Sequence, residues 1–326
     1  TCFSKIIILL TLNSMSNFNI LVTCPPMLGM LDSFELIAKK YNLNLIPVKV
    51  TQTLCEKELI KIISKFDGWI IGDDPATRKV IEAGLQGSLK AVVKWGVGVD
   101  NVDFEACRDL EIKVNNTPNM FGSEVADIAM GYVIGLARNT FIIDRKVREG
   151  KWYKPQGIAL KGKKVGLVGY GDIGKQTAKR LIASEMEVIV YDPYLKKEPF
   201  DSKFKFSKWP QYINQVDFIV INCALSSSSY HLLNSEAFKL MKKGVRIVNV
   251  GRGPIIDEKA LLSALLSGKV HSAALDVFEN EPLNSNSPLK QFENCIFGSH
   301  NASNTIDGVI KTSNKALKIM SEFLGS

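Results

Sequence analysis

His300 is the one of the chain's three histidines whose setting suits proton transfer. It follows the apolar run Cys295 to Phe297, which is typical of a short strand, and precedes small polar residues that suit the start of a helix. An imidazole ionises near pH ~6.5, so it can give or take a proton close to neutrality. A single histidine at such a corner is more often structural, so its role depends on what else the chain brings to it.

Two further residues could complete a hydride-transfer site with His300. Arg252 stands between glycines in NVGRGPIIDEKAL, just past a strand pattern. The guanidinium fork of arginine can take a carboxylate with two parallel hydrogen bonds. Glu281, in AALDVFENEPL, could hold an imidazolium if it lies close to His300. Glu279, in the same loop, is interpreted as a solvated acid.

A glycine-rich stretch predicts a dinucleotide-binding loop between an apolar strand pattern and a helical one. It reads Gly169, Tyr170, Gly171, Asp172, Ile173, Gly174. Gly169 would make the tight turn, Gly171 would let the backbone approach a pyrophosphate, and Gly174 would let the helix pack closely. Unpaired amides and the positive end of the helix would stabilise the anion. The Asp172 carboxylate does not help there electrostatically, and capping of the helix from outside is the alternative role considered for it.

Asp192 ends the next strand pattern, EVIVY, eighteen residues after Gly174. A carboxylate in that position can accept both hydroxyls of an adenosine ribose and would repel a 2′-phosphate. The pattern therefore favours NAD over NADP as the cofactor.

Two series of alternating strand and helix patterns must position these residues. The first has strand patterns at 19–23, 45–50, 69–72, 91–95 and 112–116, and helical ones at 30–41 and 56–66. The second has strand patterns at 164–168, 187–191, 218–223, 245–250 and 271–277, and the chain closes with a helix at about 305–323. Short Val/Ile-rich runs spaced by amphipathic helices predict parallel sheets covered on both faces. The expected fold class is α/β with two doubly wound domains.

A long helix is expected to mark the boundary between the two domains. It would begin near Ser123, a suitable N-cap, and stop at Gly150. Helices of this length often join domains or pack across dimers, and packing in the core is the alternative explanation.

Composition narrows the functional class. The 326 residues suggest about two domains, and 46% hydrophobic with 23% charged residues is ordinary for a globular protein. No apolar run approaches the roughly 20 residues that span a bilayer. The net charge of +8 is dispersed and not interleaved with aromatics, so no nucleic-acid partner is expected, although it could steer an anionic substrate. Six cysteines without metal spacing suit reduced thiols of a cytoplasmic protein with no metal site.

The first residues raise the question of where the natural chain starts. TCFSKIIILLTLNS does not begin with Met, and Met15 opens a first buried strand pattern. We hypothesise that translation starts at Met15 and that residues 1–14 are a non-native or disordered extension. A signal peptide is the alternative, since Lys5 precedes an apolar run, but no small-residue cleavage site is clear.

Seven motifs in a specific order resemble those of the D-2-hydroxyacid dehydrogenases, and most of all the phosphoglycerate dehydrogenase branch. They are KWGVGVDNVD, NNTPN, GYGDIG, YDP, NVGRGPIIDEKAL, ALDVFENEPL and FGSHNASNT. The resemblance implies a flavodoxin-like substrate domain, formed by residues 15–120 and 301–326, with a Rossmann NAD-binding domain inserted at 121–300. It also implies a homodimer.

The resemblance implies a role for each site residue. Arg252 falls on the arginine that binds the substrate carboxylate, Glu281 on its acid partner and His300 on the general acid/base, so these three are the expected catalytic residues. Asp276 falls on an aspartate beside the nicotinamide, where it would meet the carboxamide. The implied split fold would let His300, at the exit from the cofactor domain, face the cleft between the domains.

Substrate contacts are expected from the first domain. The resemblance implies that the amides of Val97 and Gly98 also bind the substrate carboxylate. Lys94 stands where an arginine is frequent and could meet a phosphate as a point charge. Asp73 and Asp74 stand where some phosphoglycerate enzymes have basic contacts, and two carboxylates there would discourage a phosphorylated substrate.

The favoured hypothesis is an NAD-dependent oxidoreductase that transfers a hydride between the cofactor and a D-2-hydroxy or 2-oxo acid, with 3-phosphoglycerate as the specific expectation. The alternative is a glyoxylate or hydroxypyruvate reductase, or another D-2-hydroxyacid dehydrogenase. A non-catalytic NAD-binding protein like the related corepressors is a third hypothesis, but pure binding would not need Arg252, Glu281 and His300 together. Formate oxidation is disfavoured because the resemblance implies an amide at this position in the formate branch, whereas this chain has the acid Glu281.

Overall fold

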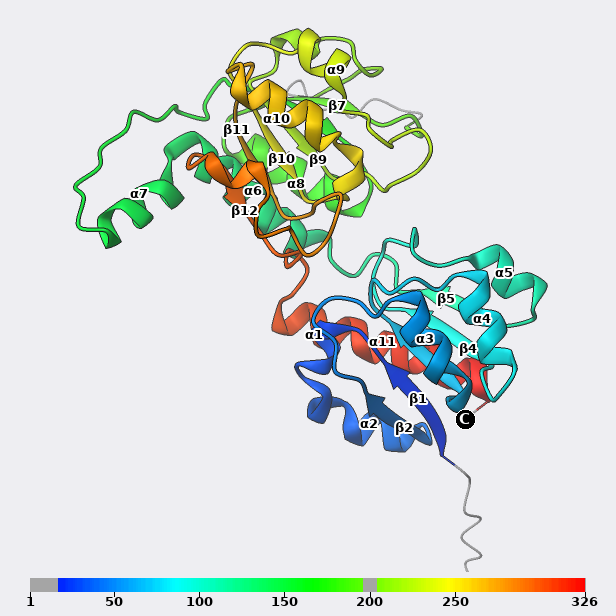
Figure 1. Ribbon diagram of the computed structural model, residues 1–326. Coiled ribbons are helices and arrows are strands. Elements are labelled where there is room, and N and C mark those ends of the chain that lie inside the picture. The colour runs from blue at the N-terminus through cyan, green and yellow to red at the C-terminus, as the bar shows by residue number, and fades with distance from the viewer. Residues whose placement is uncertain (1–16, 196–203, 326) are drawn as a thin grey trace, which may run out of the picture. The chain divides into compact units, whose positions relative to one another are not determined.

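The computed structural model describes residues 17–195 and 204–325, so the extension expected at residues 1–14 lies outside the described residues (Figure 1). The chain divides into two compact units. Unit 1 comprises the chain up to Trp95, Val102–Asn116 and the chain from Ser313, and unit 2 comprises Gly96–Asn101 and Thr117–Thr312. Compared with the expected domain bounds, unit 2 also takes residues 96–101, 117–120 and 301–312.

Unit 1 is built on a five-stranded parallel sheet in the order β2-β1-β3-β4-β5. The strands are β1 (Phe18–Val22), β2 (Leu43–Pro47), β3 (Gly68–Ile71), β4 (Ala91–Lys94) and β5 (Lys113–Asn116). The helices are α1 (Pro25–Leu28), η1 (Leu31–Phe34), α2 (Glu35–Lys40), α3 (Glu56–Ile62), η2 (Ile63–Lys65), α4 (Arg78–Leu85) and α5 (Phe104–Asp109). Every residue of β3 and β4 is buried, as expected of central parallel strands covered on both faces.

Unit 2 is built on a seven-stranded parallel sheet in the order β12-β11-β10-β9-β6-β7-β8. The strands are β6 (Lys164–Val168), β7 (Glu187–Tyr191), β8 (Phe204–Phe206), β9 (Phe218–Ile221), β10 (Val245–Asn249), β11 (Val270–Leu275) and β12 (Ile296–Phe297). The helices are α6 (Gly122–Arg138), α7 (Thr140–Arg148), α8 (Asp172–Ala183), η3 (Ile213–Gln215), α9 (Ser235–Leu240), η4 (Gly253–Ile255), α10 (Glu258–Leu266) and η5 (Pro288–Gln291). The last helix, α11 (Ile306–Leu324), begins in unit 2 and continues from Ser313 in unit 1. The strand order reverses between β6 and β9, and such switch points are where doubly wound sheets bind ligands.

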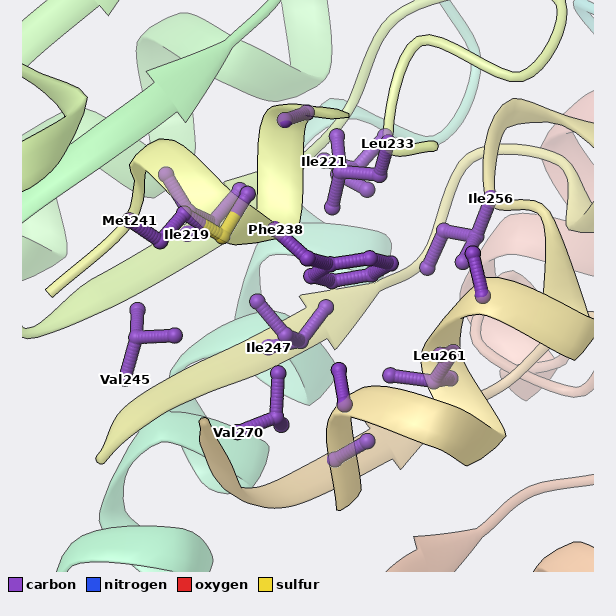
Figure 2. Close-up of a cluster of buried hydrophobic side chains, with 14 of the residues drawn as sticks. Ile219, Ile221, Leu233, Phe238, Met241, Val245, Ile247, Ile256, Leu261 and Val270 are labelled. Atoms are coloured by element: carbon purple, nitrogen blue, oxygen red, sulfur yellow. The ribbon is translucent and has the colours of Figure 1, made fainter. Parts of the chain in front are cut away.

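An apolar layer holds α9 and α10 against the sheet of unit 2 (Figure 2). Phe238 of α9 lies over Ile247 of β10, and Leu261 of α10 packs into the same cluster. Removing this apolar surface from water stabilises the packing of α9 and α10 on the sheet. The predicted α/β class with two parallel sheets is confirmed.

The single helix predicted from Ser123 to Gly150 is wrong, because the structure has two helices there. α6 and α7 are bent by 68° at Asn139, whose φ of 59° is left-handed. Asparagine tolerates this conformation better than most residues, so it can end one helix and begin the next. Ser123 lies inside α6, and Phe121 takes the N-cap position.

No single helix among residues 17–195 and 204–325 is long and apolar enough to cross a bilayer. The bent pair of α6 and α7 has enough length and apolar character to do so by those two measures alone. More than half of the α6 residues are buried within unit 2.

Candidate active site

The glycine-rich loop lies at the switch point of the unit 2 sheet, between β6 and α8. Gly169 has a φ of +91°, and a Cβ there would lie 2.7 Å from the Cα of Cys223. A Cβ at Gly174 would overlap the carbonyl oxygen of Gly169, whereas one at Gly171 would meet no atom of the described chain within 4 Å. The turn and the helix packing therefore require two of the glycines, and the third leaves open space at the start of α8. Such a loop fits a pyrophosphate bound at a helix N-terminus.

Asp192 is fixed beside this loop at the end of β7. Its Oδ2 accepts a hydrogen bond from the Tyr170 amide at 2.8 Å, and its Oδ1 accepts one from the Tyr194 amide at 2.9 Å. The Tyr170 ring packs edge-on against Phe204 and Phe206 of β8. The carboxylate is thus held next to the phosphate loop, where a ribose-binding acid is needed for NAD.

Asp172 is the first residue of α8, and its carboxyl group points at the start of α6. A Cβ at Gly122 would lie 2.5 Å from its Oδ1. The negative charge therefore lies close to the positive end of a second helix, which is a stabilising arrangement. Ile173 contributes its carbonyl oxygen, which accepts a hydrogen bond from the Thr177 hydroxyl at 3.0 Å inside α8.

His300 and Glu281 form a close pair in unit 2. His300 Nδ1 lies 2.7 Å from Glu281 Oε2, and the two side chains are 20% and 21% exposed. Glu281 Oε1 accepts a hydrogen bond from the Phe278 amide at 2.9 Å, which fixes the carboxylate. Because Nδ1 is engaged by the acid, exchange of a proton with a substrate would use Nε2.

Asp276 anchors the loop that carries His300. Its carboxylate is buried and accepts hydrogen bonds from the amides of Asn301 at 3.3 Å and Ala302 at 2.9 Å, and from the Tyr132 hydroxyl at 3.3 Å. Its carbonyl oxygen accepts one from the His300 amide at 2.7 Å. Burial, and then the charge of Asp276, raises the pKa of Tyr132, so this hydroxyl stays a donor. The expected contact of Asp276 with the nicotinamide stays a prediction.

Arg252 and the glycine loop at residues 96–101 lie together in unit 2. Arg252 Nε donates a hydrogen bond to Asp100 Oδ1 at 3.1 Å, and Nη1 donates one to the Gly251 carbonyl at 2.9 Å. A Cβ at Gly98 would overlap the guanidinium. Asn249 fixes the backbone of the arginine loop, since its Nδ2 donates to the Arg252 carbonyl at 2.9 Å. Arg252 and Gly98, two of the residues expected to bind a carboxylate, are therefore in direct contact, and Val97 beside them is 39% exposed.

Lys94 belongs to unit 1 and is bonded within it. Its side chain is 3% exposed, and its ammonium donates hydrogen bonds to the Gly72 carbonyl and, at 2.9 Å, to Asp73 Oδ1. Asp74 is fully buried and accepts hydrogen bonds from the Thr23 hydroxyl and, at 2.7 Å, from the Leu54 amide. Burial raises the pKa of Asp74. These hydrogen bonds engage the Lys94 ammonium inside unit 1, so they do not support the expected contact with a substrate. Asp74 does not face solvent.

One interpretation of a surface residue is wrong. Glu279 is not a solvated acid, because its Oε1 lies 2.7 Å from His231 Nε2 and its side chain is 25% exposed. His231 lies outside the seven motifs and is paired through this contact. Asp100 and Asn249 were also missed, although both lie inside quoted motifs, GVGVDN and NVGRG. Across residues 17–195 and 204–325, no group of His, Cys, Asp or Glu could hold a metal ion.

Comparison with known proteins identifies the family of the chain. Residues 130–302 match the model of the D-isomer specific 2-hydroxyacid dehydrogenase NAD-binding domain. The chain is 38% identical to the hydroxypyruvate reductase of Thermotoga maritima over 77% of its own length and 82% of that enzyme. It is also 38% identical to the D-3-phosphoglycerate dehydrogenase of Methanocaldococcus jannaschii, over 79% of its own length but only about half, 50%, of that enzyme.

Solved structures extend the likeness over both units. The apo-structure of D-lactate dehydrogenase from Escherichia coli has a TM-score of 0.82 and 26% identity, and the match covers 94% of this chain and 97% of that one. The cofactor of the matched domain is NAD, as the phosphate loop and Asp192 predicted. On these grounds the chain belongs to the D-isomer specific 2-hydroxyacid dehydrogenases and is an NAD-dependent oxidoreductase.

Proposed function

We propose that this enzyme reduces short 2-oxo acids to D-2-hydroxy acids with NADH, and that its preferred acid carries no phosphate group. Glyoxylate and hydroxypyruvate are the simplest substrates of this kind. The name of the Thermotoga maritima relative, of which the chain covers 82%, supports the same choice.

The site residues suit the reaction as follows. Arg252 would bind the substrate carboxylate with its guanidinium fork, and the amides of Val97 and Gly98 would add contacts beside it. This grip would orient C2, which turns a bimolecular step into an effectively unimolecular one. Bound NADH would supply the hydride. His300, held by Glu281, would polarise the carbonyl of the substrate and donate a proton to its oxygen as the alcohol forms.

The state of Lys94 is the observation that favours an unphosphorylated acid. It is the cation expected to meet a phosphate, yet its ammonium is buried and bonded to Asp73 at 2.9 Å. The negative charge of Asp73 offsets the positive charge of Lys94, which would otherwise attract a phosphate group. Recruiting the almost fully buried ammonium of Lys94 would require breaking this ion pair and its hydrogen bond to the Gly72 carbonyl, which is costly.

A second candidate is oxidation of 3-phosphoglycerate, or the reverse reduction. It is supported by the motifs that resemble the phosphoglycerate dehydrogenase branch and by the name of the Methanocaldococcus jannaschii relative. We further propose a cytoplasmic location, supported by the five described cysteines, all of which are free thiols.

Initial rates of NADH oxidation test the proposal. The substrates are glyoxylate, hydroxypyruvate, pyruvate, 2-oxoglutarate and 3-phosphohydroxypyruvate, each run with wild type, His300→Ala and the control His271→Ala. Fast turnover of an unphosphorylated acid, lost in His300→Ala and kept in His271→Ala, is the expected result. A clear preference for 3-phosphohydroxypyruvate would favour the second candidate instead. Silence across the panel with NADH still bound would reject catalysis in favour of a binding role.

A further inference from the structure

Unit 2 holds a second histidine–glutamate pair besides His300 and Glu281. His231 Nε2 lies 2.7 Å from Glu279 Oε1, and the side chains are 31% and 25% exposed. The His231 ring also stacks on Tyr230, with ring centroids 4.1 Å apart. His231 has a left-handed φ of 47°, a conformation that costs free energy for a residue with a Cβ and persists where surrounding contacts enforce it.

Two hydrogen bonds join Glu279 to Glu258 at the start of α10. The Glu279 amide donates a hydrogen bond to Glu258 Oε1 at 2.8 Å, and the Glu258 amide donates one to Glu279 Oε1 at 3.3 Å. Burial first, and then the charges of Glu279 and Glu281, raise the pKa of Glu258. Three acids therefore gather where the β11 loop meets α10, and His231 is the basic group bonded to Glu279.

The residues directly after Arg252, Gly253 to Ile255, contact the chain segments that carry both partners of this pair. On one side the His231 amide donates a hydrogen bond to the Pro254 carbonyl at 2.9 Å, and the Leu233 amide donates one to the Ile255 carbonyl at 3.1 Å. On the other side Gly253 packs so closely on the backbone of Phe278 that a Cβ would overlap it. The His231 segment and the Glu279 segment thus hold the residues directly after Arg252 from both sides.

The same loop connects to the proton-transfer pair. The Phe278 amide donates a hydrogen bond to Glu281, which holds His300. We infer that His231 and Glu279 are a positioning pair that sets the spacing between Arg252 and His300. This inference rests on the proposed function, in which Arg252 grips the carboxylate while His300 serves the adjacent carbonyl. Without the imidazole, Glu279 would lose the 2.7 Å contact that ties its segment to the His231 segment, and the residues after Arg252 would be held less firmly.

Steady-state kinetics with the best acid of the panel test the inference. For His231→Ala we expect the KM for the acid to rise about 10-fold, with the KM for NADH within about twofold of wild type, since displacement of a substrate-orienting group is costly. His231→Gln keeps a donor that can reach Glu279, so it should recover most of the loss. His271→Ala is the matched control. Its ring contacts Ser272, and its kinetics should not change.

A binding measurement removes any dependence on turnover. Oxamate, a 2-oxo acid analogue, should bind the NADH complex about 10-fold more weakly in His231→Ala, and Glu279→Gln should weaken it in the same direction. Equal rises in both KM values, or a lower Tm with an unchanged KM for the acid, would mean that the pair only supports the fold and would overturn the inference. If His231→Ala does not fold, Glu279→Gln and His231→Gln carry the test. Glu279→Gln should still weaken binding of oxamate, and His231→Gln should still bind it nearly as well as wild type.

Arg252→Ala separates the two proposals. If Arg252→Ala raises the KM for the acid and His231→Ala does not, the proposed function stands and the positioning role is wrong. If Arg252→Ala leaves the KM unchanged, the carboxylate grip itself is wrong and the inference falls with it.

Discussion

Gly98 and Arg252 lie so close together that a methyl group at position 98 would displace the guanidinium. A Cβ at position 98 would overlap the guanidinium and lie 3.1 Å from Asp100 Oδ1. Gly98→Ala should therefore displace the arginine and raise the KM for the 2-oxo acid about 10- to 100-fold, since a 1 Å misplacement can cost that much. The KM for NADH should stay near the wild-type value.

Gly131→Ala is a suitable control for this variant. A Cβ at Gly131, on the exposed face of α6, would meet nothing within 4 Å. Equal KM values for the acid in Gly98→Ala and Gly131→Ala would contradict the prediction. They would mean that acid binding does not depend on the place that the Arg252 guanidinium takes beside Gly98.

Asp74 gives a prediction about stability and pH. Burial raises the pKa of this carboxyl group, so the folded protein binds its proton more tightly than the unfolded chain does, whose pKa is near ~3.9. The stabilisation from that proton is fully present below the unfolded value and is lost as pH rises through the folded value. Asp74→Asn carries no charge and should lack this dependence. Urea unfolding at several pH values between 4 and 8 should show wild type losing stability relative to the variant, and parallel curves would contradict this.

At the scale of elements, the sequence predicted the strands better than the helix ends. The strands of both sheets lie close to the Val/Ile-rich runs, because fully buried parallel strands need apolar residues at every position. β8 was missed, since Phe204–Phe206 is short and its middle residue is exposed. The break between α6 and α7 was missed because only the backbone of Asn139 marks it, and the apolar spacing runs on through it.

Two glycines of α6 should respond in opposite ways to the same substitution. Gly131→Ala adds a methyl group in open space and should stabilise the protein by about 0.5–1 kcal/mol, because glycine loses more backbone entropy on folding. A Cβ at Gly135 would lie 2.7 Å from the Phe141 ring and 2.8 Å from Ile296 Cδ1. Gly135→Ala should cost about 1–3 kcal/mol through overpacking. Thermal unfolding should rank Gly131→Ala above wild type and Gly135→Ala below it, and equal midpoints would show that α7 adjusts freely.

At the scale of the whole molecule, the site was predictable where loops follow neighbouring strands. Arg252 follows β10 and Glu281 follows β11, and the carboxyl ends of adjacent parallel strands share one edge of a sheet. The pairing of Asp100 with Arg252, of His231 with Glu279, and of Lys94 with Asp73 could not be predicted. Each joins segments far apart in the sequence, and the choice of partner depends on packing rather than on motif spacing.

The exposed surface of α7 carries the last prediction, a homodimer. None of the residues of α7 is buried, and two of its apolar residues are well exposed: Phe141 is 42% exposed and Val147 is 44% exposed. Trp152, in the segment after it, is 83% exposed, and Figure 1 shows α7 and this segment extending away from the seven-stranded sheet. Clustered apolar exposure of this kind marks protein interfaces, and a second copy of the chain is the partner expected from the family resemblance.

Light scattering should therefore give about twice the 36.1 kDa chain mass. Val147→Asp and Trp152→Asp should each shift the enzyme toward the monomer, because a charge in an apolar contact is left without a partner. Leu36→Asp is the control, since Leu36 is 85% exposed on α2 of unit 1, outside this cluster. A monomeric wild type would refute the dimer. A dimer weakened by none of these changes would place its interface elsewhere, and one weakened by Leu36→Asp alone would place it on unit 1.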